Sequence, residues 1–141
     1  MVVANTAIDN AGAGIASASA GAVITDNVLT RNTLGGVLVT NGAAPLIINN
    51  AIGGNFGEGI SLDDTIGGTV TANRAGANGG SGLSLNKSDG ALIDGNDFSA
   101  NHGFGMRIDR STADFDAAPG TQTPPGSNDV SGNRKGDIEI R

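Results

Sequence analysis

Two aspartates and an asparagine recur at equal spacing, and they are the first residues of this sequence that suggest chemistry. Asp63, Asn86 and Asp109 follow one another at intervals of 23 residues. If each interval forms one coil of a stack, the side chains lie one above another, and a rise of about 4.8 Å per coil puts the two carboxylates about 9.5 Å apart. That separation is at the upper edge of the roughly 6.5–9.5 Å expected for the acid and base of an inverting glycosidase.

Basic residues accompany this column and widen the chemistry that it could support. Lys87 and Arg107 could neutralise a uronate while a carboxylate removes a proton from the sugar, as a lyase or an epimerase requires. For a polysaccharide-active enzyme we therefore predict Asp63, Asp109, Lys87 and Arg107 as the catalytic residues. The expected substrate-binding residues are Asp64, Asn86, Arg110 and Phe104.

The same residues also have interpretations without catalysis. Asp64 against Lys87 and Asp109 near Arg107 would form a ladder of neutralised surface charges, and such exposed ion pairs add only about 0–1 kcal/mol each. Sugar binding without turnover is another alternative. We predict no dedicated metal site and no cofactor, but calcium would suit the oxygen donors of Asp63, Asp64, Asn86 and Asp109.

Other catalytic and metal-binding motifs are missing from the sequence. The chain has no Cys, which removes disulfides, thiolate metal sites and cysteine nucleophiles. The single histidine, His102, follows Asn101 at an expected exposed turn, and no serine or cysteine motif accompanies it, so a catalytic triad is not supported.

A repeat of about 23 residues sets the spacing of these side chains and runs along the whole chain. Asn recurs six times, at intervals of 22 or 23 residues with one longer interval of 32, and a second Asn follows each five residues later. Apolar residues keep the same register. The first series is Asn5, Asn27, Asn50, Asn73, Asn96 and Asn128, and the second is Asn10, Asn32, Asn55, Asn78, Asn101 and Asn133.

Each repeat holds three short segments of period-2 character, which is typical of strands. A strand with two or three inward residues cannot bury itself, but stacked copies form parallel sheets. We expect Asn at corners, because it tolerates a left-handed backbone and its stacked side chains can bond along the axis. Glycine is expected at the other corners, where no Cβ fits. The predicted fold is an all-β solenoid, a parallel β-helix of about six 23-residue coils.

The alternation of Asn corners with Gly-Ile-x-Leu strands, as in residues 59–62, resembles the right-handed parallel β-helix of the pectate-lyase-like superfamily. This resemblance implies a right-handed coil, an extracytoplasmic or secreted location, and a sugar-binding groove on the outer face of that strand. The superfamily includes lyases, hydrolases, epimerases, adhesins and inert spacers, so the resemblance is specific for fold and not for activity.

A single domain of residues 1–141 is expected, with a loop insertion over residues 111–126 that contains Pro119, Pro124 and Pro125. The first coil is poor in large side chains, and no amphipathic helix precedes it to close the stack. An unclosed end is a pairing edge. We therefore expect either a fragment of a longer β-helix or a homo-oligomer formed through the N-terminal coil.

The composition of the chain limits the classes of partner that it is expected to bind. A net charge of −6 disfavours nucleic acid, and no apolar run approaches the length of a membrane span. Nineteen of the 22 charged residues lie from Glu58 onward, so a site is expected in the last four coils. The leading hypothesis is a non-catalytic structural or carbohydrate-associated solenoid, the C-terminal part of a larger extracytoplasmic polysaccharide-processing protein. The alternatives are a small polysaccharide-active enzyme (glycoside hydrolase, lyase or epimerase) and a self-associating scaffold.

Overall fold

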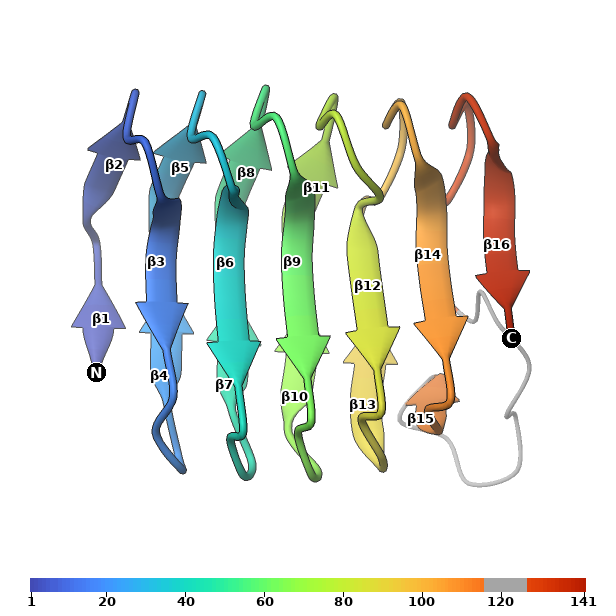
Figure 1. The fold of residues 1–141 in the computed structure, drawn as a ribbon, viewed down its shortest axis with the longest axis horizontal. Coiled ribbons are helices and arrows are strands. Elements are labelled where there is room, and N and C mark those ends of the chain that lie inside the picture. Colours follow the sequence, from blue (N-terminus) through green and yellow to red (C-terminus); the bar gives the residue numbers. More distant parts are fainter. Residues whose placement is uncertain (116–126) are drawn as a thin grey trace.

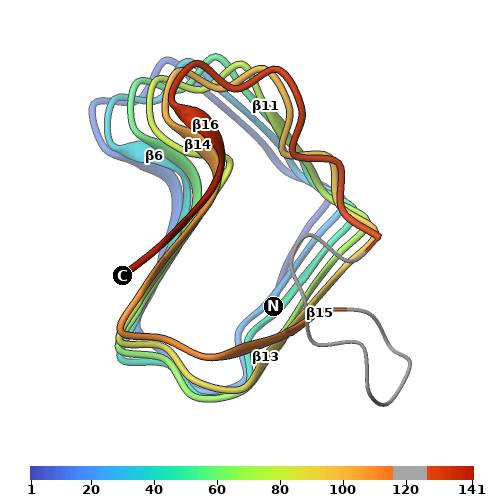
Figure 2. The same cartoon turned by 90° about the vertical axis from the view of Figure 1, so that its right-hand side faces the viewer.

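The computed structural model describes residues 1–115 and 127–141, and these form a parallel β-solenoid (Figure 1). The first four coils each contribute one strand to each of three parallel sheets, and the last two contribute strands to two of the sheets. The described residues include no helix. Five complete turns separate the first strand, β1, from β15. Viewed along the stack, successive coils superpose (Figure 2), so the predicted all-β solenoid with its 23-residue period is confirmed.

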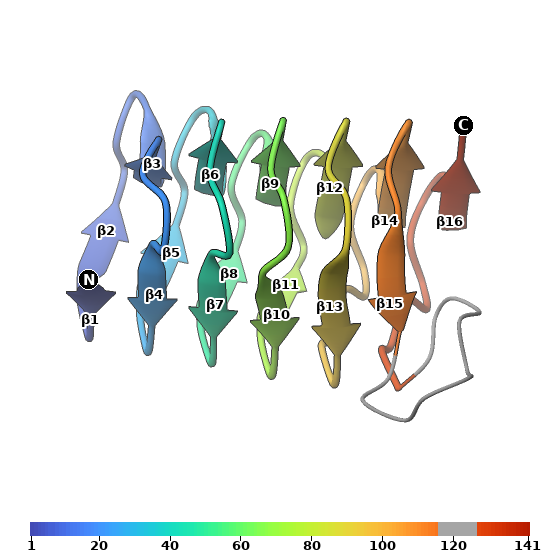
Figure 3. The same cartoon turned by 90° about the horizontal axis from the view of Figure 1, so that it is seen from below.

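The three sheets follow one another around each coil. Sheet 1, seen from below in Figure 3, contains β1 (Val2–Val3), β4 (Val23–Thr25), β7 (Leu46–Ile48), β10 (Thr69–Thr71), β13 (Ala91–Asp94) and β15 (Ala113–Phe115). Sheet 2 contains β2 (Thr6–Ile8), β5 (Val28–Thr30), β8 (Ala51–Gly53) and β11 (Arg74–Gly76). Sheet 3 contains β3 (Ala13–Ser17), β6 (Gly35–Thr40), β9 (Glu58–Asp63), β12 (Leu83–Asn86), β14 (Phe104–Asp109) and β16 (Gly136–Ile140).

The core is a set of apolar columns that run along the stack. In sheet 1, Ile24, Ile47, Val70 and Ile93 pair in register and are each at most 1 % exposed. Phe98 is fully buried, as its place in the repeat predicts. A solenoid this narrow is filled by stacked aliphatic residues, which explains why the chain needs so few aromatic side chains.

Two asparagine ladders hold the corners on either side of sheet 2. In each ladder the Asn side-chain amide donates to the Asn Oδ1 of the next coil, at 2.9 Å from Asn50 to Asn73 and 3.0 Å from Asn73 to Asn96. The expected bonding along the axis is therefore confirmed. The expected reason for the corner is wrong, because the left-handed residue is the one before the ladder Asn, for example Ala72 at φ 54° before Asn73.

A third ladder, which the sequence did not reveal, follows sheet 3. Ser88 Oγ accepts from the Thr65 backbone N at 3.1 Å, and Ser111 Oγ accepts from the Ser88 backbone N at 2.9 Å. The side chain of Ser88 is fully buried and donates to backbone carbonyls. Hydroxyl groups thus do at this corner what amides do at the other two.

The recurring glycine before the third apolar position lies inside sheet 3 and not at a corner, which corrects that expectation. The steric reason holds, because a Cβ on Gly59 would lie 2.6 Å from the Gly82 carbonyl oxygen and 2.9 Å from the Ala75 Cβ. The sheet 3 strands therefore approach sheet 2 more closely here than any side chain would allow.

The stretch expected to be an insertion begins with regular structure. Residues 113–115 form β15, where Phe115 pairs with Ile93 and is 3 % exposed. Residues 116–126, with Pro119, Pro124 and Pro125, lie outside the described residues. Within the described ranges, no helix is long and apolar enough to cross a membrane.

Candidate binding groove

The outer face of sheet 3 carries the predicted column. The strands β9, β12 and β14 lie side by side in this sheet (Figure 1). Asp63 pairs with Asn86, and Asn86 pairs with Asp109, so the three residues form one column along the stack. An open groove of about 380 Å³ follows this face. Its lining is entirely polar or charged: Glu58, Ser61, Asp63, Ser84, Asn86, Arg107, Asp109 and Arg110.

A chain of hydrogen bonds joins the column. The Asn86 amide donates to Asp63 Oδ1, and Arg110 Nη2 donates to Asn86 Oδ1 at 3.1 Å. Arg110 also donates from Nε to Asp109 Oδ1 at 3.3 Å and from Nη2 to Asp109 Oδ2 at 3.1 Å. Both predicted catalytic carboxylates therefore already have partners, and Arg110, expected only to bind substrate, organises the site.

The electrostatics of the groove favour an ionised Asp109. Hydrogen bonds from Arg110 lower the pKa of this carboxyl, and the charges of Arg110, Arg107 and Arg141 lower it further, while partial loss of hydration opposes them. Asp109 is consequently a carboxylate at neutral pH. It can accept a hydrogen bond from a sugar hydroxyl, but the lowered pKa makes it a weak proton acceptor and a poor general acid.

The ion pairs differ from the ladder of surface charges that was expected, in which Asp64 faced Lys87 and Asp109 lay near Arg107. Arg107 Nε lies 3.3 Å from Glu139 Oε2, close enough for an ion pair but without hydrogen-bond geometry. Glu139 also accepts from Arg141 at 2.7 Å. Among the described residues, neither Asp64 nor Lys87 forms an ion pair, and both are exposed at left-handed corner positions.

A second hollow of about 300 Å³ adjoins the groove and shares Glu58 and Arg107 with it. Phe104 lines this hollow, and its ring lies beside Gly136 of the next coil. Together the two hollows extend the polar face from β9 to β16. Phe104 shares this hollow with the cationic residues Arg107, Lys135 and Arg141, and its binding role stays a prediction.

Ten residues that line the two hollows were not among the predicted site residues, and Glu58, Ser61, Ser84 and Glu139 are four of them. Ser61, Ser84 and Glu139 occupy the same column as Arg107. Glu58 accepts a hydrogen bond from the Ser81 backbone N in the next coil. The other residues of its column are Ala13, Gly35, Ser81, Phe104 and Gly136. Glu58 is the one charged residue in that column, and this could have identified it from the sequence.

The calcium alternative gains no support. Among the described residues, no group of three or more histidine or acidic side chains could hold a metal ion. His102 is exposed, as its turn position predicts.

Comparison with known proteins identifies the fold. Residues 1–118 match the family profile described as "Right handed beta helix region". A crystal structure of a mutant of the periplasmic alginate epimerase AlgG superposes with a TM-score of 0.49 and 16 % identity, over 98 % of this chain and 44 % of that chain. The chain thus spans less than half the length of that structure. A search of curated proteins gave no significant match.

Proposed function

We infer, from the premise that this chain belongs to the right-handed β-helix family, that it is a carbohydrate-associated solenoid whose sheet 3 face binds a polysaccharide without turning it over. In this proposal it forms part of a larger extracytoplasmic polysaccharide-processing protein. The absence of cysteine is compatible with that location and does not require it.

The observation that carries the proposal is the open polar groove. Serine hydroxyls, the Asn86 amide, carboxylates and guanidinium groups line it, and these are the groups that exchange hydrogen bonds with sugar hydroxyls. The groove lies on the paired strands of sheet 3, so its donors and acceptors repeat at about 4.8 Å along the stack. The backbone hydrogen bonds between these strands hold them in place. An extended chain of sugar units fits such a surface better than a compact ligand.

A binding assay with a matched pair of variants tests the proposal. Affinity for a panel of polyuronates and neutral glycans is measured by calorimetry for the wild type, Asn86→Ala and Asn49→Ala. Asn49 donates to Asp26 of the preceding coil as Asn86 donates to Asp63, but Asn49 lies outside the groove. We expect Asn86→Ala to weaken binding about tenfold and Asn49→Ala to leave it unchanged. No binding across the panel would refute the proposal.

The enzymatic alternative would use Asp109 and Asp63 with Arg107 in the groove and Lys87 at the adjoining corner, and the lowered pKa of Asp109 counts against it because it weakens that carboxylate as a base. Analysis of reaction products on the same panel of glycans distinguishes this enzyme from a protein that only binds. Turnover by the wild type that is lost in Asp109→Asn would replace the binding proposal with an enzyme. Binding without product would exclude the enzyme for those glycans.

A further inference from the structure

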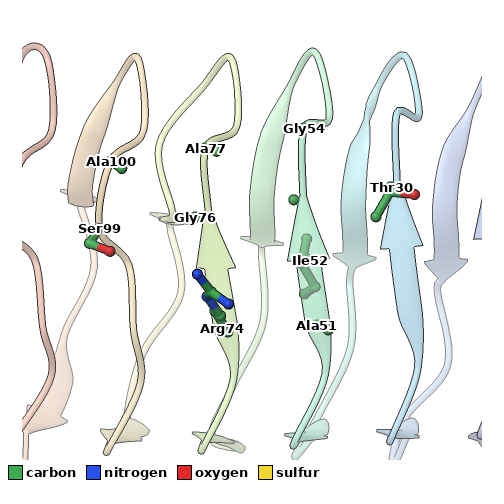
Figure 4. Close-up of a pocket in the computed structure, with 10 residues that line it drawn as sticks. Thr30, Ala51, Ile52, Gly54, Arg74, Gly76, Ala77, Ser99 and Ala100 are labelled. Atoms are coloured by element: carbon green, nitrogen blue, oxygen red, sulfur yellow. The ribbon is translucent and has the colours of Figure 1, made fainter.

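The outer face of sheet 2 is less polar than the groove, with Thr6, Thr30 and Arg74 as its polar outward residues, and it changes shape along the stack. In the first coils its outward side chains are bulky, and Ile8 and Val28 are each 41 % exposed. Beyond them lies a hollow of about 370 Å³ (Figure 4), because the outward residues become small. The small residues in its lining are Ala51, Gly53, Gly54, Gly76, Ala77 and Ala100.

The register of sheet 2 shows where the change occurs. One outward column reads Thr6, Val28, Ala51 and Arg74, and the other reads Ile8, Thr30, Gly53 and Gly76. Both columns therefore pass from larger to smaller side chains at the step from β5 to β8. The face is therefore a raised half followed by a hollow half, in which Arg74 is the one large outward side chain of the two columns.

We propose that this face packs against the same face of a second copy of the chain, about a two-fold axis parallel to the strands between β5 and β8. The rotation reverses the coil order, so β5 faces β8 of the second copy and β2 faces its β11. Val28 then lies over Ala51, Thr30 over Gly53, and Ile8 over Gly76. Each of these three contacts joins a raised residue to a small one and occurs twice, as an isologous interface requires. The fourth places Thr6 over the long side chain of Arg74.

The charges on this face permit its burial. Arg31 donates to both carboxylate oxygens of Asp9 at 2.7 and 2.8 Å, and Arg74 lies 3.4 Å from Asp97. Both arginines on this side of the chain therefore have an acidic partner in the single copy. The Arg74 side chain is 81 % exposed, so it can move aside for Thr6 of the second copy.

The charge distribution along the chain favours a second copy in this orientation. Nineteen of the 22 charged residues, with a net negative sum, lie from Glu58 onward. Reversing the coil order places these halves at opposite ends of the dimer, which minimises their repulsion. The groove on sheet 3 stays open in both copies, so the proposal is independent of carbohydrate binding.

The size of the face sets the strength of the association. Four strands at about 4.8 Å, each about 10 Å long, give a footprint on the order of 200 Å² per copy. Stable interfaces bury about 800 Å² per partner. The dimer is accordingly weak and forms only at high protein concentration.

Sedimentation velocity from about 10 μM to about 1 mM tests the interface in the whole chain. We expect the wild type to pass reversibly from monomer to dimer, and Val28→Glu to weaken association about tenfold or more. Leu46→Glu is the matched control, because Leu46 is 37 % exposed on sheet 1 and outside this face. A wild type that stays monomeric at the highest concentration would overturn the proposal, as would equal losses in the two variants.

A second variant separates shape from general stickiness. Ala51→Leu adds apolar surface but fills the hollow that Val28 must enter, so we expect weaker association. The fold can accept it, since Val28 and Arg74 occupy the same column in the neighbouring coils. Stronger association of Ala51→Leu would contradict the proposed packing.

Discussion

At the scale of single residues, each buried asparagine of the ladders makes several hydrogen bonds with its side chain. Asn73 is 2 % exposed, and its amide donates to the Ile47 and Thr71 carbonyls at 2.8 and 3.0 Å and to Asn96 Oδ1 at 3.0 Å. Its own Oδ1 accepts from both nitrogens of Asn50. No other side chain of this size could serve donors and acceptors in three coils at once.

Replacing Asn73 by Ala should therefore lower the free energy of unfolding by about 2–5 kcal/mol, because several buried backbone and side-chain groups lose their partners together. Asn49→Ala is the control, since Asn49 is exposed and the side-chain bond given by its amide goes to Asp26. It should change stability by less than about 1 kcal/mol. Urea denaturation measures both; equal losses would show that the ladder bonds are not the cause.

The Asp109–Arg110 pair provides a residue-scale prediction about pH. Arg110→Gln should raise the pKa of Asp109 toward its ordinary range, because the hydrogen bonds and charge of Arg110 hold it down. The pKa of Asp9, lowered chiefly by its hydrogen bond with Arg31, should stay low. Since a lowered pKa adds stability above the unfolded value of about 3.9 and loses it as pH falls, the variant should lose less stability on acidification.

Carboxyl carbon chemical shifts followed by NMR titration measure both groups in one sample. Arg31→Gln is the converse control and should raise the pKa of Asp9 while leaving that of Asp109 low. A titration of Asp109 that is unchanged in Arg110→Gln would mean that Arg107 and Arg141 dominate its environment.

At the scale of elements, the sheet 3 strands owe their close approach to glycine. A Cβ on Gly59 would lie 2.6 Å from a backbone oxygen of the next coil, which cannot move without disturbing the strand ladder. We expect Gly59→Ala to destabilise the chain by about 2–4 kcal/mol. A Cβ on Gly12 would meet nothing within 4 Å, so Gly12→Ala should be neutral within about 0.5 kcal/mol. Thermal unfolding compares them, and similar melting temperatures would contradict the steric argument.

Strand positions and register could be predicted from the sequence because the repeat restricts them. Asn, Gly and apolar residues return at one interval, and a shift of register by one residue would turn every inward residue outward. Features that break or supplement the repeat could not be predicted in the same way. Phe115 extends sheet 1 within the stretch that was expected to be a loop insertion. The ladder of Thr65, Ser88 and Ser111 keeps the 23-residue spacing but spans fewer coils than the Asn series.

The groove was predictable in position and less so in contacts. Constant register places Asp63, Asn86 and Asp109 in one column before any coordinates are known. Which long side chain reaches which carboxylate depends on rotamers and corner geometry, so Arg110 and not Arg107 pairs with Asp109. The role of Glu58 depends on a single backbone N–H in the next coil, which sequence spacing does not encode.

At the scale of the whole molecule, each coil contacts only its neighbours, so energetic coupling should be short-ranged. Asn50 and Asn73 share direct hydrogen bonds, whereas Asn27 and Asn96 are three coils, about 14 Å, apart on the same ladder. Asn→Ser keeps a hydroxyl at the corner, as Ser88 does in the third ladder. In double-mutant cycles with this substitution, the interaction free energy between Asn50 and Asn73 should exceed about 0.5 kcal/mol. The second pair should be additive within about 0.3–0.5 kcal/mol. Coupling of similar size across three coils would show that the ladder polarises as one unit, and that the stack folds as a single cooperative body instead of a chain of nearest-neighbour contacts.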